Sequence, residues 1–206
     1  MREIWEKAYK NNIKTSMESI SGCGSSLDQT KEVVRQLPIL FEKYGITSML
    51  DIPVGDMHWI YGVNLKYVDY IGADIVQEQV QSNVEKYEHI GMHFQCLDIT
   101  KDDLPKVDLI LCRDLLVHFS FEDVFAAFRN IVRSGSTYFL STTFTDKYNM
   151  RIATGEWHCI NLRLPPYSLP KPLELIVEGC TLGDGAYASK SLGLWPITDL
   201  KGVIER

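Results

Sequence analysis

Apolar and polar residues follow two periods along this chain, and the two periods alternate. Four segments repeat apolar residues every three or four positions, which is typical of amphipathic helices. Between them lie short apolar runs of strand length, and helices alternating with such runs favour an α/β domain whose sheet is mostly parallel. The predicted helices span residues 1–12, 27–44 (interrupted at Pro38), 75–90 and 121–133, and the predicted strands span residues 46–51, 66–74, 92–97, 107–112, 135–144, 173–180 and 189–197.

The segment 48–59 contains the first crossover of the predicted sheet. A short apolar run ends in Asp51 and enters a turn built on Pro53 and Gly55, after which the apolar spacing that begins at Trp59 predicts a helix. In an open parallel sheet this turn presents backbone amides to a ligand. Asp51 suits a ligand with a positive charge or with hydroxyl groups.

The next two predicted strands also end in an acidic residue. Asp74 follows Asp51 by 23 residues, and Asp98 follows Asp74 by 24, which is the length of one helix and one strand. A carboxylate at the end of a second parallel strand is placed to accept hydrogen bonds from ribose hydroxyls. The spacing therefore predicts a nucleoside site at the carboxyl ends of the strands.

The turn after the first strand resembles motif I of the class I S-adenosylmethionine-dependent methyltransferases, in which an acidic residue precedes three spaced glycines. Those three places hold Pro53, Gly55 and Met57 here. The form D-x-P-x-G-D, preceded by S-G-x-G-S at residues 21–25, is similar to small bacterial members of the family. The resemblance implies a single Rossmann-like domain over residues 1–206, with a mostly parallel seven-stranded sheet, a C-terminal antiparallel hairpin and helices on both faces.

The resemblance also implies S-adenosyl-L-methionine as the cofactor. Asp51, Gly55 and Asp56 would hold its methionine end, Asp74 both ribose hydroxyls and Asp98 the adenine amine. The turn-rich stretch 16–26 is open to two interpretations, a surface loop whose Ser25 or Ser26 caps the next helix, or a lid over the cofactor's carboxylate. The cofactor set predicted in full is Asp51, Pro53, Gly55, Asp56, Trp59, Asp74, Ile75, Asp98, Ile99 and Arg113.

His118 and Asp114 are the candidate catalytic residues, because in the family the loop after the fourth strand borders the transferred methyl group. An imidazole accepts a proton near neutral pH, so His118 is the first candidate base; the alternative is that it caps a helix or lines the pocket. Arg113 has two interpretations: it binds the cofactor's carboxylate or an acidic acceptor, or it forms a salt bridge within the protein. Asp114 with Asp146 and Asn149 fits a magnesium scheme only loosely, and we assign no metal site.

Residues 145–171 form a long, aromatic-rich segment without sustained periodicity, and such loops are usually functional. We interpret the segment as an acceptor-side loop, and residues 1–45 as an N-terminal helical cap. The alternative for the loop's polar residues is simple surface exposure. The candidate acceptor-binding residues are Glu156, Trp157, His158 and Tyr167.

Composition narrows the class of partner. The 206 residues carry a formal net charge of −6 without a block of Lys or Arg, which disfavours nucleic acid. A small-molecule or glycan acceptor is favoured, with a hydroxyl of a sugar or secondary metabolite as the methylated group.

No apolar run approaches the length of about 18 residues that a membrane span needs, and we expect a cytoplasmic protein. Five scattered cysteines predict reduced thiols, not disulfides or a zinc site.

Two other classes of protein share parts of this pattern. A nicotinamide-dependent oxidoreductase has the first crossover and the ribose-binding acid, but it is expected to keep the G-x-G-x-x-G turn that Pro53 and Met57 break. A non-catalytic partner protein with the same fold is expected to lose the strand-end carboxylates. The sequence indicates neither the accepting atom nor the oligomeric state.

Overall fold

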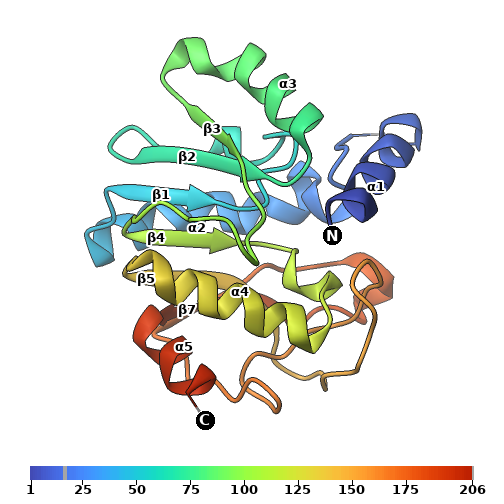
Figure 1. Cartoon of the computed structure of the whole chain (residues 1–206), viewed down its shortest axis with the longest axis vertical. Coiled ribbons are helices and arrows are strands. Elements are labelled where there is room, and N and C mark those ends of the chain that lie inside the picture. Colours follow the sequence, from blue (N-terminus) through green and yellow to red (C-terminus); the bar gives the residue numbers. More distant parts are fainter. Residues whose placement is uncertain (16–17, 206) are drawn as a thin grey trace.

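The computed structural model describes residues 1–15 and 18–205, so Ser16 and Met17 of the predicted turn-rich stretch lie outside the described residues. One seven-stranded sheet has the order β3-β2-β1-β4-β5-β7-β6 (Figure 1). Strands β3, β2, β1, β4 and β5 are parallel, which confirms the mostly parallel sheet, whereas β7 runs antiparallel to both β5 and β6. The strands are β1 (Ser48–Asp51), β2 (Asp69–Asp74), β3 (His93–Cys96), β4 (Leu109–Cys112), β5 (Tyr138–Phe144), β6 (Glu174–Val177) and β7 (Lys190–Pro196).

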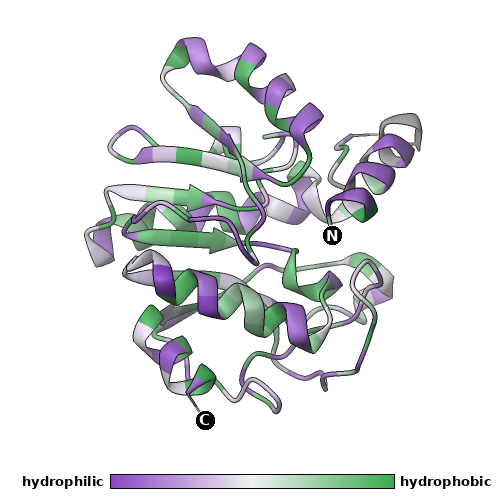
Figure 2. Cartoon of the chain, in the orientation of Figure 1, coloured by the Kyte–Doolittle hydropathy of each residue, from purple (hydrophilic) through white to green (hydrophobic). Residues whose placement is uncertain are grey.

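Helices cover both faces of the sheet and bury their apolar stripes against it. Val33 and Leu37 of α2 pack with Met49 of β1 in the core on one face. Phe128 of α4 and Leu200 of α5 belong to the core on the opposite face, and Figure 2 shows the apolar strand β4 between helices whose outer faces are polar. The helices are α1 (Arg2–Thr15), α2 (Leu27–Tyr44), α3 (Gln77–Tyr87), α4 (Phe121–Ser134) and α5 (Ile197–Ile204).

The two longest sheet-covering helices begin and end at residues with a capping function. The side chain of Ser26 accepts a hydrogen bond from the Gln29 amide at the start of α2, which confirms one of the two predicted caps. Ser120 caps α4 in the same way. Both helices end at a glycine in the left-handed conformation, Gly45 and Gly135.

Three local predictions were wrong. Helix α2 continues through Pro38, because the buried residues on either side of it hold the helix to the sheet despite a cost of about 3 kcal/mol for an internal proline. The turn after β1 leads into a short 3₁₀ helix, Ile60–Gly62, and not into an α-helix. The last predicted strand ends at Pro196, after which α5 begins.

The parallel strands place their carboxyl ends along one edge of the sheet. Helix α1 lies beyond this edge, next to the points of the β1 and β4 arrows (Figure 1). Among the described residues, no helix has both the length and the apolar character that crossing a membrane requires. The edge under α1 is where the predicted ligand-binding residues meet.

Candidate cofactor and active site

A cavity of about 420 Å³ lies at the carboxyl ends of β1, β2 and β4. Its walls come from α1, the segment 18–26, the turn after β1, the start of α3 and the loop after β4. A second hollow of about 20 Å³ adjoins it and shares Trp5, Pro53, Ile75 and Leu115 with it. Segments distant in the sequence therefore enclose one site.

The turn after β1 approaches the cavity closely because it contains Gly55. This residue has a φ of 57°, a left-handed conformation that favours glycine. Its amide donates to Oδ2 of Asp74 at 3.2 Å, and its carbonyl accepts from Nδ2 of Asn83 at 2.7 Å. A Cβ at this position would lie 2.1 Å from Oγ of Ser21. The turn is thus fixed between β2, α3 and the segment 18–26.

Asp74 presents a buried carboxylate to the cavity. It accepts hydrogen bonds from the amides of Gly55 and Val76, which fix its orientation. Burial raises its pKa, while these two amides act in the opposite direction. Among the described residues, Asp74 and Asp114 are the aspartates that line this cavity.

Asp98 lies beside the smaller hollow, between apolar walls formed by Ile75, Ile99 and Leu115. Its Oδ1 accepts from the amide and the hydroxyl of Thr100 at 3.0 and 2.6 Å. A space this small, with apolar walls and a nearby carboxylate, suits one edge of a flat group that carries a hydrogen-bond donor. The structure therefore brings Asp74 and Asp98 to adjoining parts of one site.

Asp51 does not line either space. It is 2% exposed and accepts a hydrogen bond from the Tyr70 hydroxyl at 2.8 Å, beneath the turn. Asp56 also lies outside both linings, because its carboxylate accepts from the side chain of Ser19 and the amide of Ile20. Its role in this structure is to hold the segment 18–26.

We call residues 18–26 the lid segment. Ile20, Ser21, Gly22 and Ser25 from this segment line the cavity. One end of the lid segment is held by Asp56, and the other end by Arg113, whose Nη2 donates to the Gly24 carbonyl at 2.8 Å. The structure thus combines the two interpretations of this stretch, because Ser26 caps α2 while the residues before it cover the cavity.

His118 lines the cavity with one ring nitrogen already engaged. Its Nδ1 lies 2.9 Å from the carbonyl oxygen of Glu156, which only accepts, so Nδ1 carries the hydrogen. Nε2 is then the acceptor of the neutral ring. Burial lowers the pKa of His118, although the Glu156 carbonyl opposes this effect. Trp5 of α1 contacts the ring edge to face, with centroids 5.5 Å apart.

Asp114, the other candidate catalytic residue, is held in an ion-pair network. Its Oδ2 lies 2.5 Å from Nζ of Lys190 and 3.3 Å from Nη1 of Arg113. Burial alone would raise its pKa, but Arg113 and Lys190 hold it below the usual value. Asp114 is therefore a weaker proton acceptor than His118.

The candidate acceptor-binding residues of the loop 145–171 do not line the cavity. Trp157 is 45% exposed and packs against Phe144 and Tyr187. Tyr167 is fully buried in the core beside α4, where its ring fills space between helix and loop. From this loop Gly155 reaches the cavity, while the Glu156 carbonyl orients His118 and the buried His158 donates its amide to the Val117 carbonyl.

The predicted site residues therefore fall into three groups. The cavity is lined by Pro53, Gly55, Trp59, Asp74, Ile75, Arg113, Asp114 and His118. The smaller hollow adds Asp98 and Ile99. Neither is lined by Asp51, Asp56, Glu156, Trp157, His158 or Tyr167.

Sequence reasoning did not identify several residues at the site. Trp5 and Tyr9 of α1 cover the cavity, although the helical spacing of the segment 1–12 indicated only a packing face. Gln79 is 4% exposed, lines the cavity and donates to Asn83. The signal for Gln79 was an amide pair spaced by four residues beside the apolar stripe of a helix.

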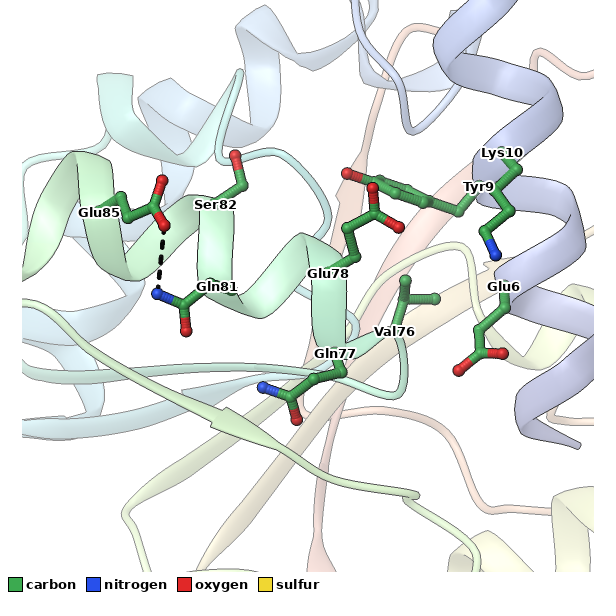
Figure 3. Close-up of a pocket in the computed structure, with 9 residues that line it drawn as sticks. All are labelled: Glu6, Tyr9, Lys10, Val76, Gln77, Glu78, Gln81, Ser82 and Glu85. Atoms are coloured by element: carbon green, nitrogen blue, oxygen red, sulfur yellow. Dashed lines mark hydrogen bonds between the residues drawn. The ribbon is translucent and has the colours of Figure 1, made fainter.

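An open groove of about 650 Å³ lies between α1 and α3 (Figure 3). Tyr9 and Val76 line both this groove and the cavity, so the two are neighbours. Glu6 and Glu78 stand on its opposite walls, and Gln81 donates to Glu85 farther along α3. The groove therefore adjoins the cavity at Tyr9 and Val76.

The buried Asp51 leads to a prediction about stability. Burial raises its pKa to about 7, while Tyr70 and Arg113 oppose this effect. In the unfolded chain this proton is lost near pH ~4. The folded protein therefore binds more protons between these values, so the free energy of unfolding decreases as the pH rises through this window and is constant above it.

Asp51→Asn keeps a neutral group that accepts from Tyr70. We expect its free energy of unfolding, relative to that of the wild type, to increase by about 3 kcal/mol between pH 5 and pH 8, since each pKa unit corresponds to about 1.4 kcal/mol. Urea unfolding at a series of pH values measures this difference. A constant difference across that range would contradict the prediction.

No protein-family profile matches this chain, and no curated protein matches it. Solved structures do. The [4+2]-cyclase SpnF aligns with a TM-score of 0.56 and 15% identity over 79% of this chain and 80% of its own. The N-methyltransferase NodS from Bradyrhizobium japonicum, in complex with S-adenosyl-L-homocysteine, aligns with a TM-score of 0.54 and 12% identity over 66% of this chain and 73% of its own.

Other matches are partial. Magnesium protoporphyrin IX methyltransferase from Synechocystis aligns with a TM-score of 0.46 and 17% identity over 56% of this chain and 55% of its own, so the chain spans about half the length of that enzyme. The likeness to SpnF and NodS, at TM-scores of 0.56 and 0.54 and identities of 15% and 12%, establishes the fold alone. The Rossmann-like fold of the methyltransferases is therefore the fold of this chain.

Proposed function

We propose that this protein binds S-adenosylmethionine in the cavity and transfers its methyl group to a small-molecule acceptor. The observation that carries the proposal is the pair of strand-end carboxylates, Asp74 and Asp98, in adjoining hollows under the Gly55 turn. The fold alone does not specify the chemistry, because SpnF shares it and is a cyclase.

The residues present fit this cofactor. Asp74 offers a buried carboxylate to two ribose hydroxyls, and the carboxylate of Asp98 with its apolar neighbours suits the amine edge of adenine, because a hollow of about 20 Å³ holds only part of the ring. Gly55 lets the turn pack closely against Ser21 of the lid segment, so that both can line the cavity. NodS, which has the same fold, was crystallised with S-adenosylhomocysteine.

When bound, the cofactor supplies a methyl group on a positively charged sulfur, and the protein has to align an acceptor with it. We assign His118 as the general base for an acceptor hydroxyl, since its Nε2 is the unprotonated acceptor of a half-buried imidazole that lines the cavity. A sugar or a secondary metabolite is the acceptor class that we propose. Trp157, which is exposed and lies two residues after the cavity-lining Gly155, is the residue that we propose to contact it.

Calorimetric titration tests the proposal. We expect the wild type to bind S-adenosylmethionine and S-adenosylhomocysteine with micromolar affinity. Asp74→Ala removes the acceptor of two hydroxyl hydrogen bonds to a charged group, worth about 3 kcal/mol together, so we expect an affinity loss of about 100-fold. Thermal unfolding of the variant confirms that it is folded.

Asp69→Ala is the matched control, because Asp69 is exposed at the opposite end of the same strand. It should retain the wild-type affinity. Binding of a nicotinamide dinucleotide, with no binding of either S-adenosyl compound, would reject the methyltransferase and favour an oxidoreductase. Binding of the cofactor without methyl transfer to any acceptor would favour a cyclase-like or non-catalytic role.

A further inference from the structure

Four ionisable side chains from separate parts of the chain form a buried network at one end of the cavity. Arg113 and Asp114 follow β4, Glu178 follows β6 and Lys190 begins β7. Oε2 of Glu178 lies 2.7 Å from Nη2 of Arg113 and 3.4 Å from Nζ of Lys190. Asp114 bridges the same two cations from the other side.

Burial differs among the four residues. The side chains of Arg113, Glu178 and Lys190 are 3%, 1% and 7% exposed, whereas that of Asp114 is 28% exposed. Asp114 and Arg113 line the cavity, but Glu178 and Lys190 do not. The network therefore presents the side chains of Asp114 and Arg113 to the cavity, while Lys190 and Glu178 lie behind them.

The position of Asp114 is fixed by its backbone as well as by its charge partners. It has a φ of 56°, an uncommon conformation for a residue with a side chain. Its amide donates to Oγ1 of Thr142 at 2.8 Å, and the same hydroxyl lies 3.3 Å from Oδ1. Strained backbone of this kind is concentrated at functional sites.

The charges of the network sum to zero, with two cations and two carboxylates. Without Glu178, Asp114 would face two buried cations alone, and the surroundings would repel a positively charged ligand. Glu178 lies against the same cations and cancels one charge. This arrangement leaves the carboxylate of Asp114, which faces the cavity, able to attract a cation. The adenosine part of the cofactor carries no positive charge, so the cation has to come from another part of the ligand.

We propose that Asp114 pairs with the ammonium group of the cofactor's amino-acid end, and that Glu178 is a positioning residue that balances Arg113 and Lys190 so that this carboxylate is available. The inference rests on the proposed function. It gives binding partners to the amino-acid end of the cofactor, for which Asp51 and Asp56 do not serve because neither lines the cavity. Nε of Arg113, a buried donor without a hydrogen-bond partner among the described residues, suits the neighbouring carboxylate of that zwitterion.

Two ligands separate this role from a structural one. S-adenosylhomocysteine carries the amino-acid end, whereas 5′-methylthioadenosine keeps the adenosine and the thioether but lacks it. For Glu178→Gln we expect about tenfold weaker binding of the former, with the affinity for the latter changed less than about twofold. Asp114→Asn should show the same selective loss, and it remains informative if Glu178→Gln does not fold.

Glu174→Gln is the matched control, because Glu174 lies on β6 but binds Lys43 and Tyr44 away from the cavity. It should leave both affinities unchanged. Equal losses for the two ligands in Glu178→Gln and Asp114→Asn, or no loss in either variant, would overturn the inference. If the wild type binds neither ligand, the proposed function itself fails, and the inference fails with it.

Discussion

Replacing His118 by glutamine is expected to lower the turnover number of methyl transfer by about 10²- to 10⁴-fold, with the affinity for S-adenosylhomocysteine changed less than about threefold. The carbonyl of Glu156 holds the hydrogen on Nδ1, so Nε2 is the group that accepts the proton. Glutamine keeps a polar side chain but is not basic. The rate of S-adenosylhomocysteine formation with a hydroxyl acceptor measures the effect.

The pH dependence adds a second criterion for this role. Burial places the pKa of His118 below its usual value of 6.5, so the wild-type kcat/KM should fall only as the pH drops through that lower value, where the ring becomes protonated. The variant should lack this decrease. His89→Gln, at an exposed position that lines neither the cavity nor the smaller hollow, should match the wild type. Equal turnover in the two variants would argue against His118 as the base.

The strand-end acids show what the sequence could predict. Asp74 and Asp98 have the spacing of successive parallel strands, and the geometry of a parallel sheet alone brings their ends together. Asp51 has the same spacing, yet it is buried against Tyr70. Successive side chains of a strand point to opposite faces, so Asp51 lies on the face of Met49, toward the core under α2. The spacing in the sequence thus predicted the edge of the sheet at which each carboxylate lies, but not the face of the sheet to which it points.

Long-range partners explain what the sequence could not predict. Lys190 meets Asp114 across 76 positions, and Glu178 meets Arg113 across 65. No periodic pattern encodes such pairs, because each depends on how the C-terminal strands pack against β5. The positions of the aromatic residues in the loop 145–171 could not be predicted for the same reason, since the burial of Tyr167 and the exposure of Trp157 follow from tertiary packing. Residue types and their spacing in the sequence identified the candidate residues, and tertiary packing determines which of them line the cavity.

Gly55→Ala is expected to weaken S-adenosylhomocysteine binding by about 10- to 100-fold. Alanine in the left-handed conformation costs about 1–2 kcal/mol. Its Cβ would also lie 2.1 Å from Oγ of Ser21 and 3.2 Å from its Cβ, so the Ser21 side chain has to rotate and the lid segment has to shift by a few tenths of an ångström. That movement disturbs the hydrogen bonds of Ser19 and Ile20 to Asp56. Calorimetric titration measures the loss.

Two further variants separate backbone strain from displacement of the lid segment. Gly91→Ala imposes a similar strain, since Gly91 has a φ of 88°, but no atom lies within 4 Å of the new Cβ and the residue lines neither the cavity nor the smaller hollow. It should reduce stability without changing affinity. Adding Ser21→Ala to Gly55→Ala removes the clashing hydroxyl and should restore part of the affinity. If the double variant binds no better than Gly55→Ala, strain in the turn, and not the lid segment, limits binding.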